Sequence, residues 1–273
     1  MNGIYIDIDP IILHLGPFSL HWYSLAVAGG LLVGILVALK EARRVGLPTD
    51  QIFSLALWAA VAGIIGTRLF HVIDRWDFYA ANPGALLSFQ QGGLAIWGGV
   101  ALGVLVGVVY ARMNRLPVGR TADIAVLGLL SGQIVGRLGC IVNGDAAGGP
   151  TNLPWAFIYD HPNALISPSL RGIPTHPYPL YEMLYNLVVL GVLWKMRTKA
   201  LPPGFLFFTY LALYSLGRFF LTFVRQEQLI IGNLQQAQIV ALLGLIVAVP
   251  ALIWLARKPA PSAPAVSQPP LPG

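Results

Sequence analysis

The sequence contains few charged residues. Lysine, arginine, aspartate and glutamate make up 10% of its 273 residues, whereas about 25% is usual in a soluble domain. The mean hydropathy is +0.70, and several apolar runs approach the roughly 20 residues that cross a bilayer as a helix. The scarcity of charge argues against an ordinary soluble domain and predicts an all-α, polytopic membrane protein.

Cysteine is almost absent. The single cysteine, Cys140, excludes an internal disulfide and a cysteine-rich metal site. No pair of histidines has the spacing of metal ligands, and no G-x-S-x-G or other nucleophile motif occurs. We therefore predict no metal site.

Basic residues are missing from the start of the chain. None precedes Lys40, so the start of the chain lacks the positive n-region of a cleavable signal peptide, and the first apolar run is expected to be retained. Eleven of the seventeen basic residues stand in short segments beside apolar runs, which is the positive-inside pattern. The net charge of +6 therefore predicts contact with anionic membrane lipids and not with nucleic acid. The eleven are Lys40, Arg43, Arg44, Arg112, Arg115, Arg120, Lys195, Arg197, Lys199, Arg257 and Lys258.

The apolar runs predict seven membrane spans and one transmembrane domain, residues 1–258. Alternation of the basic segments places the N-terminus outside and the C-terminus in the cytoplasm. Residues 140–179, rich in Gly, Pro and Asn, are expected to form a small extracytoplasmic head without obvious regular structure. Residues 259–273 form a Pro-rich tail, predicted to be disordered and cytoplasmic. The predicted spans are 18–39, 51–73, 94–111, 121–139, 180–195, 204–224 and 236–256.

Six arginines do not follow the positive-inside pattern, because they lie within spans or on the outer side. A charge near the bilayer centre costs at least about 2.5–3.5 kcal/mol on insertion scales, so such residues usually face the bundle interior and pair with a partner. The nearby carboxylates, Asp123, Asp145 and Glu182, are too few to neutralise them. An anionic ligand such as a phospholipid headgroup is the expected partner. The six are Arg68, Arg75, Arg137, Arg171, Arg218 and Arg225.

Two stretches concentrate these arginines. In "YSLGRFFLTFVRQ", Tyr214, Arg218 and Arg225 are spaced i, i+4 and i+11, which predicts one helical face. The alternative for Arg225 is snorkelling to the interface. In "GRLGCIVNGDAAGG", Arg137 offers a planar fork suited to phosphate, and Asn143 and Asp145 can orient it. The alternative there is a Gly-rich helix end with one Arg–Asp pair.

Taken in order, seven segments resemble the bacterial prolipoprotein diacylglyceryl transferase family over residues 10–256. The resemblance implies transfer of a diacylglyceryl group from phosphatidylglycerol to the lipobox cysteine of a preprolipoprotein. A thioether forms, glycerol phosphate leaves, and no metal or cofactor is required. It also implies the bacterial cytoplasmic (inner) membrane, with the active site towards its outer face. The segments are "GPFSLHWYSL", "GTRLFHVI", "GGLAIWGG", "GRLGCIVNGDAAG", "HPYPLYE", "YSLGRFFLTFVRQ" and "QAQIVAL".

The resemblance also implies site residues. The two essential arginines of the family match Arg137 and Arg218, and the tyrosine of its first-span motif matches Tyr23. Further positions in these motifs are expected to bind substrate. Arg68 and Arg225, two of the six arginines outside the positive-inside pattern, are expected to bind it as well. These motif positions are Asn143, Gly144, Asp145, Gly148, Tyr181, Glu182 and Gln238.

Four positions depart from the family pattern. Trp97 stands where the family often has a histidine that has been proposed as a base, and Cys140 replaces an asparagine. Asp145 replaces a glutamate, and Thr222 replaces an acidic residue. The base is therefore open: His71 is one candidate, and the field of the arginines with water as proton acceptor is the competing view. Because the family has asparagine at position 140, a covalent intermediate on Cys140 is disfavoured.

Two other functions use the same arginines. A transporter or lipid flippase would carry an anion, although neither inverted repeats nor mid-span coupling carboxylates are evident. A catalytically inactive lipid-binding homologue would retain the arginines and lose the chemistry. The covalent product separates all three, because only the transferase yields a thioether-linked peptide and free glycerol phosphate.

Overall fold

The computed structural model describes residues 3–16, 18–87, 96–225 and 229–258. The Pro-rich tail, 259–273, lies outside the described residues, as do residues 92–95 of "GGLAIWGG". The chain divides into two compact units, Met1–Val37 with Ala125–Gly273 and, separately, Ala38–Ile124. The single domain expected over residues 1–258 stays a prediction.

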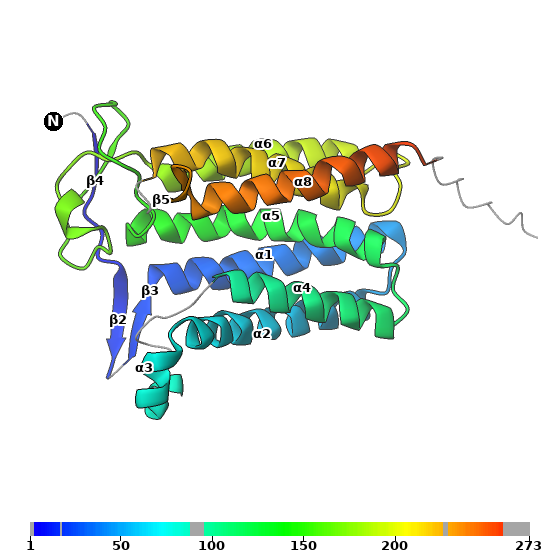
Figure 1. Cartoon of the computed structure of the whole chain (residues 1–273), viewed down its shortest axis with the longest axis horizontal. Coiled ribbons are helices and arrows are strands. Elements are labelled where there is room, and N and C mark those ends of the chain that lie inside the picture. Colours follow the sequence, from blue (N-terminus) through cyan, green and yellow to red (C-terminus); the bar gives the residue numbers. More distant parts are fainter. Residues whose placement is uncertain (1–2, 17, 88–95, 226–228, 259–273) are drawn as a thin grey trace, which may run out of the picture. The chain divides into compact units, whose positions relative to one another are not determined.

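Eight α-helices carry most of the described chain, which confirms the all-α class (Figure 1). Long runs of Leu, Val, Ile and Ala become helices because a helix satisfies all backbone polar groups within the segment, as lipid requires. The helices are α1 (Trp22–Val45), α2 (Thr49–Asp74), α3 (Trp76–Ala81), α4 (Ile96–Met113), α5 (Val118–Asn143), α6 (Tyr178–Met196), α7 (Phe205–Leu221) and α8 (Gln236–Ala256). The shorter elements are β1 (Ile4–Ile6), β2 (Ile11–Leu15), β3 (Phe18–His21), β4 (Phe157–Tyr159), β5 (Leu229–Ile231), β6 (Leu234–Gln235) and the 3-10 helices η1 (Pro83–Leu87), η3 (Pro168–Leu170) and η4 (Thr222–Val224).

Six helices in the described part of the chain are long and apolar enough to cross a membrane. They are α1, α2, α4, α5, α8 and the stretch from α7 through η4. The predicted fifth span corresponds to α6, which is not among the six and buries the polar residues Glu182 and Asn186. A polytopic membrane protein is therefore confirmed, while the seventh span and the orientation stay predictions.

Helix α5 extends beyond its predicted end at residue 139. It continues to Asn143, so Arg137 and Cys140 both project from regular helix. The helix ends where Gly144 takes a φ of 78°, a left-handed conformation that glycine adopts without steric cost. The glycines at 136 and 139 do not end the helix, and it is the backbone of Gly144 that turns the chain.

The predicted head contains more regular structure than expected. Strand β4 pairs in parallel with β1, and Ile4 lies opposite Phe157. The N-terminal arm also forms the antiparallel hairpin β2–β3. Buried side chains of the head, including Phe157, Ala164 and Ile166, form a small apolar core of their own. The segment between α5 and α6 is therefore a folded head tied to the N-terminal strand.

In the first unit, α5, α6, α7 and α8 run alongside one another (Figure 1). Helix α7 packs on both α6 and α8, and the core between α5, α6 and α7 includes Leu127, Leu130 and Leu193. Glycines bring the backbones of α1 and α5 together. A Cβ added at Gly30 would lie 2.6 Å from the carbonyl oxygen of Gly132, the close approach that small residues permit between membrane helices.

The second unit is built around the pair α2–α4. Here too glycines form the contact, since a Cβ at Gly99 would lie 2.5 Å from Cγ2 of Thr67 and 3.1 Å from the carbonyl oxygen of Gly63. At the other end of the unit, Ala42, Ile52 and other apolar side chains are buried together.

Candidate active site

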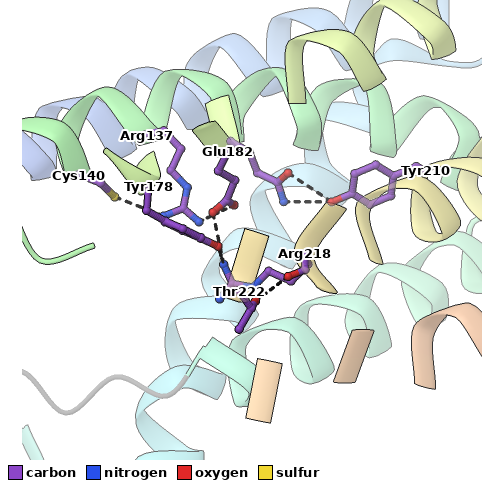
Figure 2. A network of polar contacts seen from close by, with 8 residues as sticks. Arg137, Cys140, Tyr178, Glu182, Tyr210, Arg218 and Thr222 are labelled. Atoms are coloured by element: carbon purple, nitrogen blue, oxygen red, sulfur yellow. Dashed lines mark hydrogen bonds and ion pairs between the residues drawn. The ribbon is translucent and has the colours of Figure 1, made fainter. Parts of the chain in front are cut away.

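Two arginines of the first unit share one carboxylate (Figure 2). Nη2 of Arg137 on α5 lies 2.5 Å from Oε1 of Glu182 on α6, and Nη1 of Arg218 on α7 lies 3.3 Å from Oε2. Glu182 is buried. Three helices thus place two fixed positive charges around one negative charge, and the surplus of positive charge suits an anion.

Tyr178 is the cluster residue that sequence reasoning missed. It is fully buried, and its hydroxyl oxygen accepts a hydrogen bond from Nη1 of Arg218. The guanidinium carbons of Arg218 and Arg225 lie 5.6 and 5.0 Å from the centre of its ring, within cation–π range. The available signal was its position in "HPYPLYE", one helical turn before Glu182.

The predicted common face of Tyr214, Arg218 and Arg225 is only partly regular. Helix α7 ends at Leu221, so Arg225 follows η4 instead of continuing the helix. Both arginines nevertheless contact the Tyr178 ring. The ring of Tyr214 stacks on Tyr210 with centroids 5.5 Å apart.

Thr222 stands where the family pattern has an acidic residue. Its hydroxyl donates a hydrogen bond to the backbone carbonyl of Arg218 at 2.5 Å. Towards the middle of the bundle, Nε2 of Gln133 donates to the hydroxyl of Tyr210 at 3.0 Å. Figure 2 shows the contact of Tyr210 as a separate polar pair near the arginine cluster.

The residues after Arg137 organise the end of α5. The partner of Arg137 is Glu182, and the carboxylate of Asp145 instead accepts a 3.0 Å hydrogen bond from Nδ2 of Asn143. The hydroxyl of Tyr159 in the head donates to the carbonyl of Ile141 at 2.9 Å. Burial raises the pKa of Tyr159, so this hydroxyl stays protonated and able to cap the helix end.

Gly148 joins the head to two helices. Its N–H donates to the carbonyl of His176, just before α6, at 2.9 Å, and the N–H of Gly149 donates to the carbonyl of Val224, after α7, at 2.8 Å. A Cβ at Gly148 would lie 2.7 Å from Cβ of His176 and 2.8 Å from the Val224 carbonyl oxygen. A larger residue would therefore push apart the segment that leads into α6 and the segment that follows α7.

Tyr23 and Gln238 also belong to the first unit. The backbone of Tyr23 packs against Gly139, where an added Cβ would lie 2.9 Å from Cα of the tyrosine. Gln238 is buried, and its Oε1 accepts the backbone N–H of Gln235 at 3.0 Å in a capping box at the start of α8. Nε2 of Gln235 in turn donates to the carbonyl of Arg225 at 2.9 Å.

Arg68 and His71 lie in the second unit, where each has protein partners. Nη2 of buried Arg68 donates to the carbonyl of Ala85 at 2.6 Å, and its guanidinium lies 5.2 Å from the centre of the Tyr79 ring. The imidazole of His71 meets the same ring edge-on at 5.9 Å. Their expected roles in substrate binding and catalysis stay predictions.

Cys140 is buried beside Tyr178. Its sulfur lies 3.7 Å from Nη1 of Arg137. The thiol therefore contacts the arginine side chain and lies at the edge of the cluster (Figure 2). Among the described residues, no group of three histidine, cysteine, aspartate or glutamate side chains is arranged to hold a metal ion.

Together the fold and the cluster define a multi-pass helical membrane protein with an arginine-rich polar site between its helices. The family model for prolipoprotein diacylglyceryl transferase matches residues 10–254. The chain belongs to this family, and the resemblance of its motifs is confirmed.

Relatives named phosphatidylglycerol–prolipoprotein diacylglyceryl transferase match most of the chain. The protein of Clostridioides difficile is 35% identical over 250 residues, covering 92% of this chain and 96% of the relative. That of Lysinibacillus sphaericus is 36% identical over 266 residues, covering 96% and 97%. That of Bacillus cytotoxicus is 36% identical over 257 residues, covering 94% and 95%.

Proposed function

We propose that this chain transfers the diacylglyceryl group of phosphatidylglycerol to the lipobox cysteine of a preprolipoprotein. The reaction forms a thioether and releases glycerol phosphate. Membership of the family supports the activity, and the observation that carries the mechanism is the pairing of Arg137 and Arg218 around buried Glu182. The transporter alternative is not favoured, because the relatives bear the name of a transferase.

The demanding step is cleavage of a carbon–oxygen bond with a phosphate ester as leaving group. Arg137 and Arg218 are suited to hold the phosphate and to stabilise the charge that grows on its oxygen, since fixed donors act strongly in a site that excludes water. Guanidinium groups can also bind phosphate through two parallel hydrogen bonds. The thiol nucleophile arrives on the peptide, so the enzyme supplies position and charge.

The site is proposed to open towards the outer face of the bacterial cytoplasmic membrane. Arg137 lies near the end of α5, Glu182 near the start of α6 and Arg218 near the end of α7, and all three helix ends adjoin the folded head. The basic residues Lys195 and Arg197 stand at the opposite end of α6. By the positive-inside rule that opposite end is cytoplasmic.

The activity is tested with the purified full chain in lipid nanodiscs containing phosphatidylglycerol and a lipobox peptide. Mass spectrometry is expected to show a peptide heavier by one diacylglyceryl group, with an equal amount of glycerol phosphate. A matched peptide with serine at the lipobox cysteine should stay unmodified. Movement of intact lipid without a modified peptide would identify a transporter, and binding without either would identify an inactive homologue.

Cys140→Ser is expected to lower transfer by less than about tenfold, because removal of a catalytic nucleophile costs on the order of 10⁶ in kcat. The serine keeps the size and packing of the buried thiol beside Arg137. Initial rates of thioether formation measure the effect. A fall to background, together with a diacylglyceryl adduct on Cys140 of the unsubstituted protein, would show a covalent intermediate.

The proton acceptor for the thiol is a separate matter. If His71 serves as the base, His71→Phe should lower transfer by about 10²–10⁴-fold, the usual contribution of general base catalysis. Full activity of this variant would exclude His71 as the base, and it would not affect the proposal that the arginines bind the phosphate. The field of the arginines, with water taking the proton, is the other sequence-based proposal.

A further inference from the structure

Trp155, Tyr181 and His176 form a hydrogen-bonded group at the start of α6. Nε1 of Trp155 donates to the Tyr181 hydroxyl oxygen at 2.8 Å, and Nδ1 of His176 lies 3.4 Å from the same oxygen. The imidazole and phenol rings are 6.1 Å apart between centroids. Trp155 is 48% exposed, and Tyr181 and His176 are partly exposed, so the group is accessible from the surface of the head.

The donors and acceptors of these hydrogen bonds can be assigned from the chemistry of the side chains. An indole N–H can only donate, so the Tyr181 oxygen is the acceptor from Trp155. The phenol keeps its own hydrogen, and Nδ1 of His176 is the neighbouring nitrogen that can accept it. The distance of 3.4 Å is long, but catalytic hydrogen bonds in ligand-free enzymes are often long and shorten in the substrate complex.

The group adjoins the arginine cluster through the first turns of α6. At about 100° per residue, Tyr181 and Glu182 lie roughly 60° and 40° to either side of Tyr178 around the helix axis. Tyr178 and Glu182 bind Arg218, and Glu182 also binds Arg137. One face of α6 therefore carries the groups that hold both arginines and, beside them, the phenol of Tyr181.

We propose that Tyr181 and His176 relay the proton away from the substrate thiol. This inference rests on the proposed transferase function. The thiol proton passes to the Tyr181 oxygen while the phenol proton passes to Nδ1 of His176. The sulfur forms its bond to the diacylglyceryl carbon as the carbon–oxygen bond breaks. The bonding electrons stay on the phosphate oxygen facing Arg137 and Arg218, and the imidazolium later returns its proton to water.

The surroundings of His176 suit a proton acceptor. Burial disfavours the charged imidazolium and holds the pKa of His176 below its ordinary value of about 6.5. The side chain is therefore neutral at pH 7 and free to accept a proton. Its backbone is held by Gly148 and Gly149 through hydrogen bonds of 2.9 Å, so the ring is carried on a fixed segment.

Apart from Tyr181, the charged and titratable groups on the elements around His176 contact residues other than His176. On α6, the Tyr178 hydroxyl and Glu182 face the arginines. In the loop after α5, Asp145 accepts from Asn143, and after η4 Arg225 lies over the Tyr178 ring. Tyr181 is thus the titratable group in direct contact with the imidazole.

The other described histidines have different surroundings. Nδ1 of His14 is 3.0 Å from the hydroxyl of Ser19 in the β2–β3 hairpin, and Nδ1 of His21 is 3.0 Å from a backbone oxygen. Nε2 of His161 lies 4.0 Å from Asp9 in the head. His71 belongs to the second unit. Among the described histidines, only His176 lies on the segment that leads into the arginine-binding face of α6.

The relay is tested by measuring kcat/KM for the lipobox peptide from pH 5 to pH 9 with the full chain in nanodiscs. His176→Gln and Tyr181→Phe are each expected to lower kcat/KM at pH 7 by about 100-fold or more, while the KM for phosphatidylglycerol stays near that of the unsubstituted protein. The double variant should lose little further, because the two residues act as one unit. His161→Gln is the matched control and should retain full activity.

The pH profile separates a chemical role from a structural one. In the unsubstituted protein, kcat/KM should fall as the pH drops through the lowered pKa of His176, because a protonated imidazole cannot accept a proton. In His176→Gln this acidic limb should disappear. Full activity of either variant, or a loss that leaves the limb in place, would overturn the relay. Absence of product with the unsubstituted protein would instead overturn the proposed function.

Discussion

Arg137→Ala and Arg218→Ala are each expected to lower diacylglyceryl transfer by about 1,000-fold or more. Each guanidinium reaches Glu182 from a different helix, and together they are the groups placed to hold a phosphate. Removal of one preorganised donor to a developing anion typically costs about 10²–10³ in rate, and each alanine removes a full charge with several donors. Initial rates of thioether formation, measured with saturating phosphatidylglycerol, give the size of the effect.

Two further variants sharpen this result. Arg137→Lys keeps the charge and loses the planar guanidinium group, so its activity should lie between that of Arg137→Ala and that of the unsubstituted protein. Arg171→Ala is the matched control, because Arg171 is an exposed arginine of the head that donates to the carbonyl of Pro162 at 3.0 Å. It should transfer at the normal rate. Near-normal transfer by Arg137→Ala or Arg218→Ala would refute the assignment of the site.

Glu182→Gln is expected to destabilise the protein and lower its activity. The substitution keeps the shape of the side chain but leaves two largely buried guanidinium groups facing each other without their carboxylate. Removal of one partner from a buried ion pair costs about 3–5 kcal/mol, which corresponds to a fall in Tm of roughly 6–20 °C for a chain of this size. Thermal unfolding in detergent, followed by tryptophan fluorescence, measures the shift.

A double variant is the control for this prediction. In Glu182→Gln with Arg137→Gln, only Arg218 still lacks its carboxylate, so the Tm should recover part of the loss, while transfer should remain absent. This coupling is expected for residues in one network. An unchanged Tm in Glu182→Gln would mean that the ion pairs contribute nothing to the fold.

Charge and hydropathy predicted much of this structure from the sequence. The apolar runs located the long helices, and the arginines outside the positive-inside pattern included Arg137 and Arg218 of the cluster. Both inferences depend only on the free-energy cost of placing charged groups in lipid. This cost is a property of each residue type and does not depend on the tertiary structure. The family motifs added Glu182, although its link to both arginines followed only from the structure.

Contacts between distant segments were beyond prediction from local patterns. Tyr178 lies just before the predicted fifth span, which begins at residue 180, and its contact with Arg218 depends on how α6 packs against α7. The pairing of Ile4 with Phe157 joins residues about 150 positions apart. The true end of α5 depended on the backbone angle of Gly144. Each of these features is decided by tertiary packing, which overrides local preference.

The hydrogen bonds of the head also limit how often the chain can cross the membrane. Strands β1 and β4 are paired, so they lie on one side, and the chain between them must cross an even number of times, as α1, α2, α4 and α5 allow. The backbone N–H of Gly149 donates a hydrogen bond to the carbonyl of Val224, so these two residues lie on the same side of the membrane. The chain between them must therefore also cross an even number of times. If α7 crosses, α6 must cross with it. Parity therefore supports the predicted seven crossings, with β1 and the end of α8 on opposite sides.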